Sequence, residues 1–190
     1  MRAEIITIGD ELLIGQVIDT NSAWMAQILN ASGIEVYQVT SVHDQKEHIL
    51  EAIDSAFGRV DVVLTTGGLG PTKDDITKHV LCKYFDTTLV ADADVEKHIR
   101  HLYAHRPDVL NRLTATQWMV PACATILPNR VGSAPLMVFV KEGKLLITMP
   151  GVPYEMQVAM NEQVMPYLRE RMRMNRTKIV HRTCMLSGVA

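Results

Sequence analysis

Runs of β-branched and other apolar residues alternate with segments of helical periodicity along the first half of this chain. Strand-like runs occupy residues 3–8, 35–42 and 61–66. Each is followed by a stretch with apolar residues at helical spacing, at 22–31, 46–57 and 75–85. This alternation is typical of βαβ units, in which helices cover both faces of a mostly parallel sheet. We therefore predict an α/β fold, whose ligands bind beyond the carboxyl ends of the strands.

The second half of the chain has a different pattern. APLMVFV and KLLITM, separated by KEG, predict a β-hairpin over residues 134–149, which makes the sheet mixed. Residues 94–119 are expected to form two helices interrupted by Pro107. The segment 153–173 predicts a long amphipathic helix that Pro166 is expected to kink. The buried stripe of this helix is expected to be Met156, Met160, Val164 and Leu168.

The composition of the chain excludes several classes of protein. The 190 residues suffice for one sizeable core, and 47% of them are hydrophobic. A formal charge of −2 argues against a general nucleic-acid binder, which usually carries a basic patch. No apolar stretch approaches the ~20 residues of a membrane span. Three widely spaced cysteines without a CxxC pair argue against a disulfide framework or a cysteine zinc site. We expect a cytoplasmic protein that binds neither nucleic acid nor membrane.

The stretch TTGGLGPTKDDIT, residues 65–77, places Gly67, Gly68 and Gly70 between a predicted strand and a predicted helix. Backbone N–H groups at a helix N-terminus favour an anion, and the hydroxyls of Thr65, Thr66 and Thr72 add donors. The loop matches neither the GxxxxGK[ST] nor the GxGxxG nucleotide motif. Phosphate binding is the favoured interpretation. A tight turn that needs glycine only for a positive φ remains the alternative.

Two aspartates open the helix after this loop. The helix dipole alone accounts for Asp74. Asp75 would repel a bound phosphate unless a cation or a proton-transfer role compensates. Asp10, Glu11, Asp44 and Glu155 lie in loops that reach the same edge, and clustered carboxylates favour an Mg²⁺-type site. A stripe at His98, His101 and His105 is better explained as a solvated helix face than as a zinc pair, and no histidine lies beside an evident nucleophile.

Four motifs carry a family resemblance. GDELLIGQVIDTN, TTGGLGPTKDDIT, NRVGSAP and MPGVPYEM, in this order, make residues 1–168 resemble the N-terminal domain of the CinA (competence/damage-inducible) proteins. That domain is similar to the molybdopterin-binding MoaB/MogA/gephyrin-G fold, so the resemblance implies a three-layer αβα domain. Chains of this family continue into a linking domain and a nicotinamide-mononucleotide deamidase domain. We expect residues 169–190, with a strand from residue 177, to begin a truncated linking domain, and the deamidase domain to be absent from this fragment.

The resemblance also implies which residues form the site. The ligand pocket is expected to be lined by Gly67, Gly68, Gly70, Thr72 and Asp75, with Asp44 as a second family aspartate after the second strand. The opposite wall is expected to contain Gly132, Ser133, Ala134, Pro150, Gly151 and Glu155. The family commonly continues GSAP with glycine, whereas this chain has Leu136, which leaves the approach of a ligand to that backbone open.

The activity that the resemblance implies is metal-dependent hydrolysis of ADP-ribose to AMP and ribose 5-phosphate. Asp75 and Asp44 are then catalytic, and both join Glu155 and Asp10 in holding a divalent metal, Mg²⁺, Mn²⁺ or Co²⁺, with potassium as a further candidate ion. A module that binds molybdopterin or a nucleotide without hydrolysis is the first alternative, and an assembly module is the second. The expected partners are a small-molecule nucleotide substrate and further copies of the chain, in a dimer or a trimer.

Overall fold

A six-stranded mixed sheet forms the centre of the molecule. The computed structural model describes residues 1–69, 76–106 and 117–173. Four strands run parallel, and β7 lies antiparallel to both β8 and β6. The strand order is β2 (Glu35–Val42), β1 (Arg2–Ile8), β3 (Val62–Gly67), β8 (Lys144–Met149), β7 (Leu136–Lys141) and β6 (Thr125–Leu127). The predicted hairpin is confirmed as β7 and β8.

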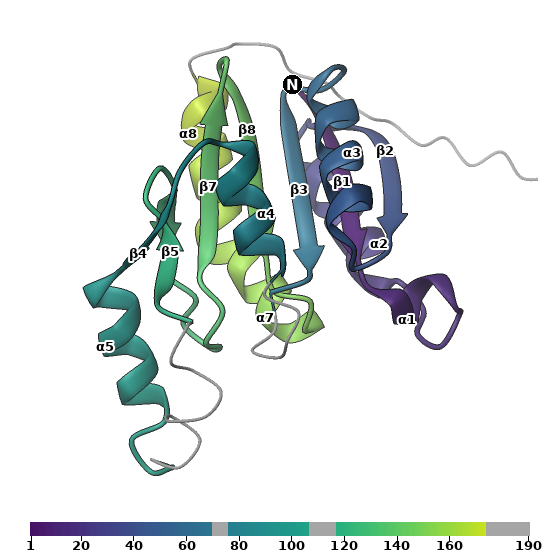
Figure 1. Ribbon diagram of the computed structural model, residues 1–190. Helices are drawn as coiled ribbons and strands as arrows, with labels where there is room; N and C mark the ends of the chain where they lie inside the picture. The colour runs from purple at the N-terminus through teal and green to yellow at the C-terminus, as the bar shows by residue number, and fades with distance from the viewer. Residues whose placement is uncertain (70–75, 107–116, 174–190) are drawn as a thin grey trace, which may run out of the picture.

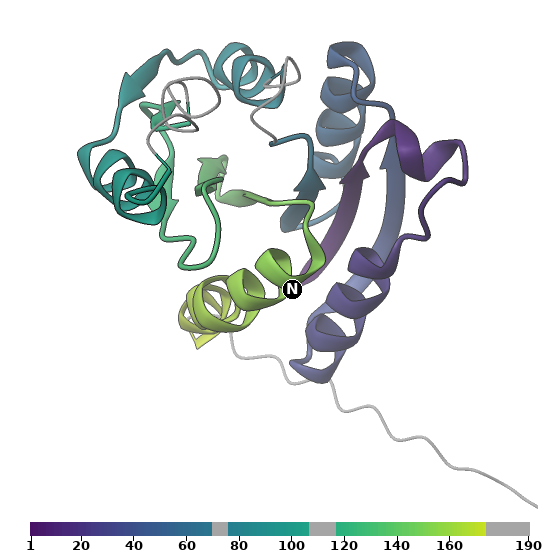
Figure 2. The same cartoon turned by 90° about the horizontal axis from the view of Figure 1, so that it is seen from below.

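Helices cover both faces of this sheet (Figures 1 and 2). One face carries α3 (Lys46–Phe57) and α4 (Ile76–Tyr84), whose apolar residues form one core cluster with β1, β3 and β7. The other face carries α2 (Thr20–Ala31) and the C-terminal helix, which form the second cluster. Each helix buries one stripe because its apolar residues recur at helical spacing. The predicted three-layer αβα architecture is confirmed.

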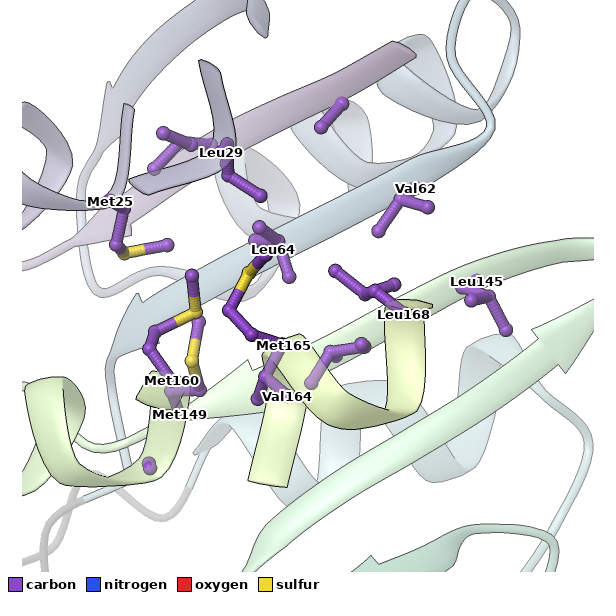
Figure 3. Close-up of a cluster of buried hydrophobic side chains, with 14 of the residues drawn as sticks. Met25, Leu29, Val62, Leu64, Leu145, Met149, Met160, Val164, Met165 and Leu168 are labelled. Carbon is purple, nitrogen blue, oxygen red and sulfur yellow. The ribbon is translucent and has the colours of Figure 1, made fainter. Parts of the chain in front are cut away.

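The C-terminal helix is the methionine-rich element of the second cluster (Figure 3). It comprises α7 (Pro153–Ala159), a π-helical turn (Met160–Val164) and α8 (Met165–Arg173). The predicted stripe is confirmed, because Met156, Met160, Val164 and Leu168 are all fully buried. The π-helical turn comes immediately before Pro166, whose ring would clash with the carbonyl four residues earlier in a regular helix. No helix in the described part of the chain is long and apolar enough to cross a bilayer.

An excursion from the sheet contains β4 (Leu89–Ala91), α5 (Ala93–Leu102) and β5 (Met119–Pro121). Its two strands pair antiparallel, and α5 projects from the body of the molecule (Figure 1). The sequence predicted helices here and missed both strands, which are too short to show periodicity. It also missed the short α1 (Asp10–Leu13). The expected helix after Pro107 and the tail strand fall largely outside the described residues.

A buried ion pair fastens α3 to the sheet. Arg59, just beyond α3, donates two hydrogen bonds of 2.8 and 2.7 Å to the carboxylate of Glu4 on β1. The Glu4 side chain is 0% exposed and that of Arg59 is 32% exposed. The pKa of Arg59 is raised, chiefly by its hydrogen bonds to Glu4. Removing one partner would leave a buried charge without compensation, which is more costly than the loss of a surface pair.

We predict that Arg59→Met lowers the free energy of unfolding by about 3 kcal/mol. Arg100→Met is the matched control, because Arg100 bonds Glu96 in an exposed i, i+4 pair and should cost less than about 0.5 kcal/mol. Urea denaturation followed by circular dichroism measures both values. Equal losses in the two variants would contradict the importance of the buried pair.

Candidate functional site

The carboxyl ends of the four parallel strands meet at one edge of the sheet, where the antiparallel β7 begins. This edge lies at the bottom of Figure 1, where the arrowheads of β1, β2 and β3 point. The loops that follow β1, β2, β3 and β8 therefore come together there with the 128–135 loop, which enters β7. Ligands of open α/β sheets bind at such an edge.

Gly67 closes the end of β3 against its neighbours. Its φ is +96°, and a methyl group there would lie 2.1 Å from the carbonyl oxygen of Ile8 on β1. On the other side, a methyl group at Gly151 would lie 3.2 Å from the Gly67 Cα. Three backbone segments thus touch around one bare Cα. Close packing of the backbone and the positive φ are sufficient to explain Gly67. For this residue the alternative interpretation, a tight turn that needs glycine, accounts for the sequence.

Gly68 occupies a different environment, which we name the Gly68 junction (Ile8, Asp44, Gly68 and Thr77). A methyl group on Gly68 would lie 2.5 Å from Thr77 Oγ1, 3.1 Å from Ile8 Cγ2 and 3.4 Å from Asp44 Oδ1. The bare Cα therefore faces a hydroxyl from α4 and a carboxylate oxygen from the loop after β2. This convergence of polar groups is the feature that packing alone does not explain.

Thr77 is a residue of this junction that the sequence analysis did not select. It lies in the first turn of α4 and is 1% exposed. Its Oγ1 has no hydrogen-bond partner among the residues that the structure describes. Since buried hydroxyls are nearly always hydrogen-bonded, an unpaired one at this edge points to a ligand or a water. The available signal was its place at the end of the DDIT motif.

Asp10 joins the loop after β1 to the loop after β2. Its Oδ1 lies 2.8 Å from His43 Nδ1 and accepts a 3.3 Å hydrogen bond from the backbone N–H of Asp44. The hydrogen bond from His43, followed by that from Asp44, lowers the pKa of the Asp10 carboxyl. Asp10 is thus a charged group whose position fixes the start of the Asp44 loop.

Asn21 is a second residue whose role the sequence analysis missed. It does not cap α2, because Asp19 does so by accepting from the backbone N–H of Ser22 at 2.9 Å. Asn21 Nδ2 instead donates to Thr66 Oγ1 at 3.2 Å and to Gly151 O at 2.8 Å. The prediction that Thr66 donates to a phosphate is wrong, because its hydroxyl donates to Pro150 O at 2.8 Å. Beside these residues lies a cavity of about 100 Å³ that extends towards Thr7 and Val17.

The opposite wall is organised by Asn129. Its Oδ1 accepts from the backbone N–H groups of Val131 and Gly132, and its Nδ2 donates to Ala134 O and to Glu155 Oε2. A methyl group on Gly132 would overlap the Glu155 carboxylate, so the loop and α7 touch at this point. Leu136 is fully buried in the core on the α2 and α7 side of the sheet, which explains how a leucine is accommodated after GSAP.

The expected site residues thus fall into two groups. Asp10 and Asp44 lie on one side with Gly67 and Gly68. Glu155 lies on the other side, with Gly132 and Ala134, next to Ser133. Among residues 1–69, 76–106 and 117–173 there is no group of three or more His, Cys, Asp or Glu side chains that could hold a metal ion. Asp75, Gly70 and Thr72 lie outside the described residues, so the metal set stays a prediction.

The predicted histidine stripe is only partly helical, because α5 ends at Leu102 and His105 lies beyond it. His98 Nε2 lies 3.1 Å from Gly132 O, so this histidine connects α5 to the 128–135 loop. His101 and His105 are exposed, as expected for a solvated helix face.

Comparison with known proteins places these features in a family. The family described as "Probable molybdopterin binding domain" matches residues 4–170. A CinA-like protein of Flavobacterium psychrophilum is 44% identical over 192 residues, covering 100% of this chain and 45% of that protein. A CinA-like protein of Cytophaga hutchinsonii is 42% identical, covering 98% of this chain and 44% of that protein. This chain therefore spans less than half the length of these relatives.

Solved structures show the same relationship. A crystal structure of the protein CinA from Thermoplasma acidophilum, titled as of unknown function, is 32% identical with a TM-score of 0.78, over 87% of this chain and 96% of that one. The molybdopterin biosynthesis enzyme MoaB from Thermus thermophilus is 20% identical with a TM-score of 0.61, over 91% and 94% of the two chains, and shares the fold. Since the family match and the CinA structure each cover nearly the whole folded region, this chain belongs to the CinA-like proteins of the molybdopterin-binding domain family.

Proposed function

We propose that this domain hydrolyses ADP-ribose to AMP and ribose 5-phosphate in a metal-dependent reaction. The observation that supports it most is the Gly68 junction, where an unpaired buried hydroxyl and a carboxylate oxygen flank a bare Cα. The hydroxyl of Thr77 supplies a donor for a phosphate oxygen. Helix α4 begins at Ile76, one residue before Thr77, and the dipole of this helix favours negative charge near its N-terminus.

The residues of this edge have separate tasks in the proposal. Thr77 orients one phosphate by donating a hydrogen bond from its hydroxyl. Asp10 holds His43 and the N–H of Asp44, and so fixes where the Asp44 carboxylate lies. Asn21 bonds both Gly151 and Thr66, which holds the loop after β8 in place against the end of β3. Asn129 fixes the opposite wall through its four hydrogen bonds.

The proposed reaction needs a divalent metal, and the donors of this edge are of the type that such a metal prefers. Asp10 and Asp44 offer carboxylate oxygens, and Thr77 offers a hydroxyl, which are hard ligands of the kind that Mg²⁺ and Mn²⁺ prefer. Asp75, which directly precedes Ile76 in the sequence, is the further ligand that the sequence predicts. When bound, the metal would neutralise phosphate charge and lower the pKa of a bound water. The sequence offers no evident covalent nucleophile, so an activated water is the fitting attacking group.

A second candidate function is the binding of molybdopterin without hydrolysis. It is favoured by the description of the matching family and by the shared fold with MoaB, a molybdopterin biosynthesis enzyme. Both functions need an anion site at the same edge, so phosphate binding alone does not separate them. Turnover of a pyrophosphate bond does.

We expect the purified 190-residue chain to release AMP and ribose 5-phosphate from ADP-ribose when Mg²⁺, Mn²⁺ or Co²⁺ is added. Chelation by EDTA should stop the release, and restored metal should recover it. Chromatographic separation of the products measures both effects. A chain that binds ADP-ribose with each metal and never cleaves it would favour the non-hydrolytic module.

The Gly68 junction generates a second prediction. Gly68→Ala should weaken binding of AMP by about tenfold or more, because the new methyl group displaces Thr77 Oγ1 from its position. Gly143→Ala is the matched control: its φ of +79° gives the same backbone strain, yet a methyl group there meets no atom within 4 Å. Calorimetric titration with AMP measures both. Equal affinities in the two variants would show that Gly68 serves only the turn.

The carboxylate and the hydroxyl of the junction can be tested separately. Asp44→Asn and Thr77→Val should each lower kcat/KM for ADP-ribose by about 100-fold while leaving the chain folded. Asp54→Asn is the control, because Asp54 is an exposed aspartate that bonds the hydroxyl of Tyr84, away from the edge. Steady-state rates with Mn²⁺ give the values. Normal turnover in folded Asp44→Asn would remove this residue from the mechanism.

A further inference from the structure

A second cavity lies beside the 128–135 loop, outside the Gly68 junction. It has a volume of about 300 Å³ and lies between α5 and the loop that enters β7. Its lining combines residues of α5, of β6 and of the loop: Asp92, Asp94, Val95, His98, Ile126, Leu127, Pro128, Asn129, Gly132, Ser133 and Pro135. The volume is at the lower end of the range of about 300–1,000 Å³ for ligand pockets.

The residues that line the cavity are unfavourable for binding a phosphate. Apolar side chains from α5, β6 and the loop form most of the surface. The charged side chains are Asp92 and Asp94, and no Lys or Arg of the described residues lines the cavity. Carboxylates repel an anion, whereas apolar walls accept a flat ring and carboxylates accept hydrogen bonds from ring or amino N–H groups. The cavity therefore suits a neutral heteroaromatic group.

The walls are held in place before any ligand enters. His98 contacts the carbonyl of Gly132, which fixes α5 to the loop. Asp92 caps α5 by accepting from the backbone N–H groups of Asp94 and Val95. Asn129 holds the loop itself through bonds within it and to α7. A cavity with fixed walls binds its ligand at a smaller ordering cost.

A continuous series of contacts joins the cavity to the glycines of the edge. Gly132 touches Glu155 on α7, and the loop that leads into α7 places Gly151 against Gly67. Gly67 and Gly151 also line the cavity beside Asn21, which at about 100 Å³ is one third of the size.

We propose that the cavity between α5 and the 128–135 loop binds the base of the nucleotide, a purine or a ring system of similar size. This inference rests on the proposed function for the position of the phosphates, and adds the orientation of the substrate. The base lies against Val95 and Leu127, with its N–H groups towards Asp94. The sugar at the other end of the pyrophosphate points towards Asn21. Recognition of the base thus comes from the excursion that contains α5.

Two substitutions in α5 test the proposal. Val95→Trp fills the cavity, and Asp94→Ala removes an exposed carboxylate with little risk to the fold. Each should weaken binding of AMP by about fivefold to tenfold, because the base loses space or a hydrogen-bond acceptor. Affinities for ribose 5-phosphate and inorganic pyrophosphate, which have no base, should stay within about twofold of the unmodified chain. Val90→Trp is the control, since Val90 is an exposed residue of β4 outside the cavity.

Calorimetry with the three ligands decides between the outcomes. Selective loss of AMP binding supports a base site in this cavity. Unchanged AMP affinity in folded Val95→Trp and Asp94→Ala overturns it, as does an equal loss for all three ligands. Failure of the proposed function has a different signature: the unmodified chain would then bind AMP through this cavity and still cleave no ADP-ribose.

Discussion

The site depends on one close approach of three backbone segments. The end of β3 packs so tightly between the end of β1 and the loop after β8 that only hydrogen fits at Gly67. A methyl group there would overlap the carbonyl of Ile8, and the backbone cannot move without breaking the parallel pairing of β1 and β3. This contact brings Gly68 over the gap between β1 and α4. Every other feature of the edge is positioned relative to it.

The polar side chains at this edge are of two kinds. Some form hydrogen bonds with other groups of the protein, and one does not. Thr66, Asn129 and Asp10 make hydrogen bonds that fix loops, so their removal would disturb geometry. Thr77 lies buried with its hydroxyl unpaired within the described part of the chain. Burial of an unpaired hydroxyl costs roughly 1–3 kcal/mol. A bound phosphate that pairs with Thr77 would recover this cost, which is why the proposal assigns it to ligand binding.

The sequence predicted those strands and helices that are long enough for the spacing of their apolar residues to form a recognisable pattern. Residues 35–42 and 46–57 form the strand and the helix expected there, and the helix buries Ile49, Ile53 and Phe57 along one face. The strands of the excursion were missed because three residues carry no period. The glycines and Asp44 could be selected from motifs. Thr77 and Asn21 end two of the same motifs, but the motifs do not reveal their roles. Asn21 acts through contacts with segments more than forty residues away, and Thr77 through a hydroxyl left unpaired by folding.

The central claim is that the pyrophosphate binds at the Gly68 junction. A crystal structure with a methylene-bridged, non-hydrolysable analogue of ADP-ribose tests it most directly. The account predicts a phosphate oxygen within about 3 Å of Thr77 Oγ1, in contact with the Gly68 backbone, and the base beside Val95. Phosphates bound elsewhere, with the Thr77 hydroxyl still unpaired, would contradict it.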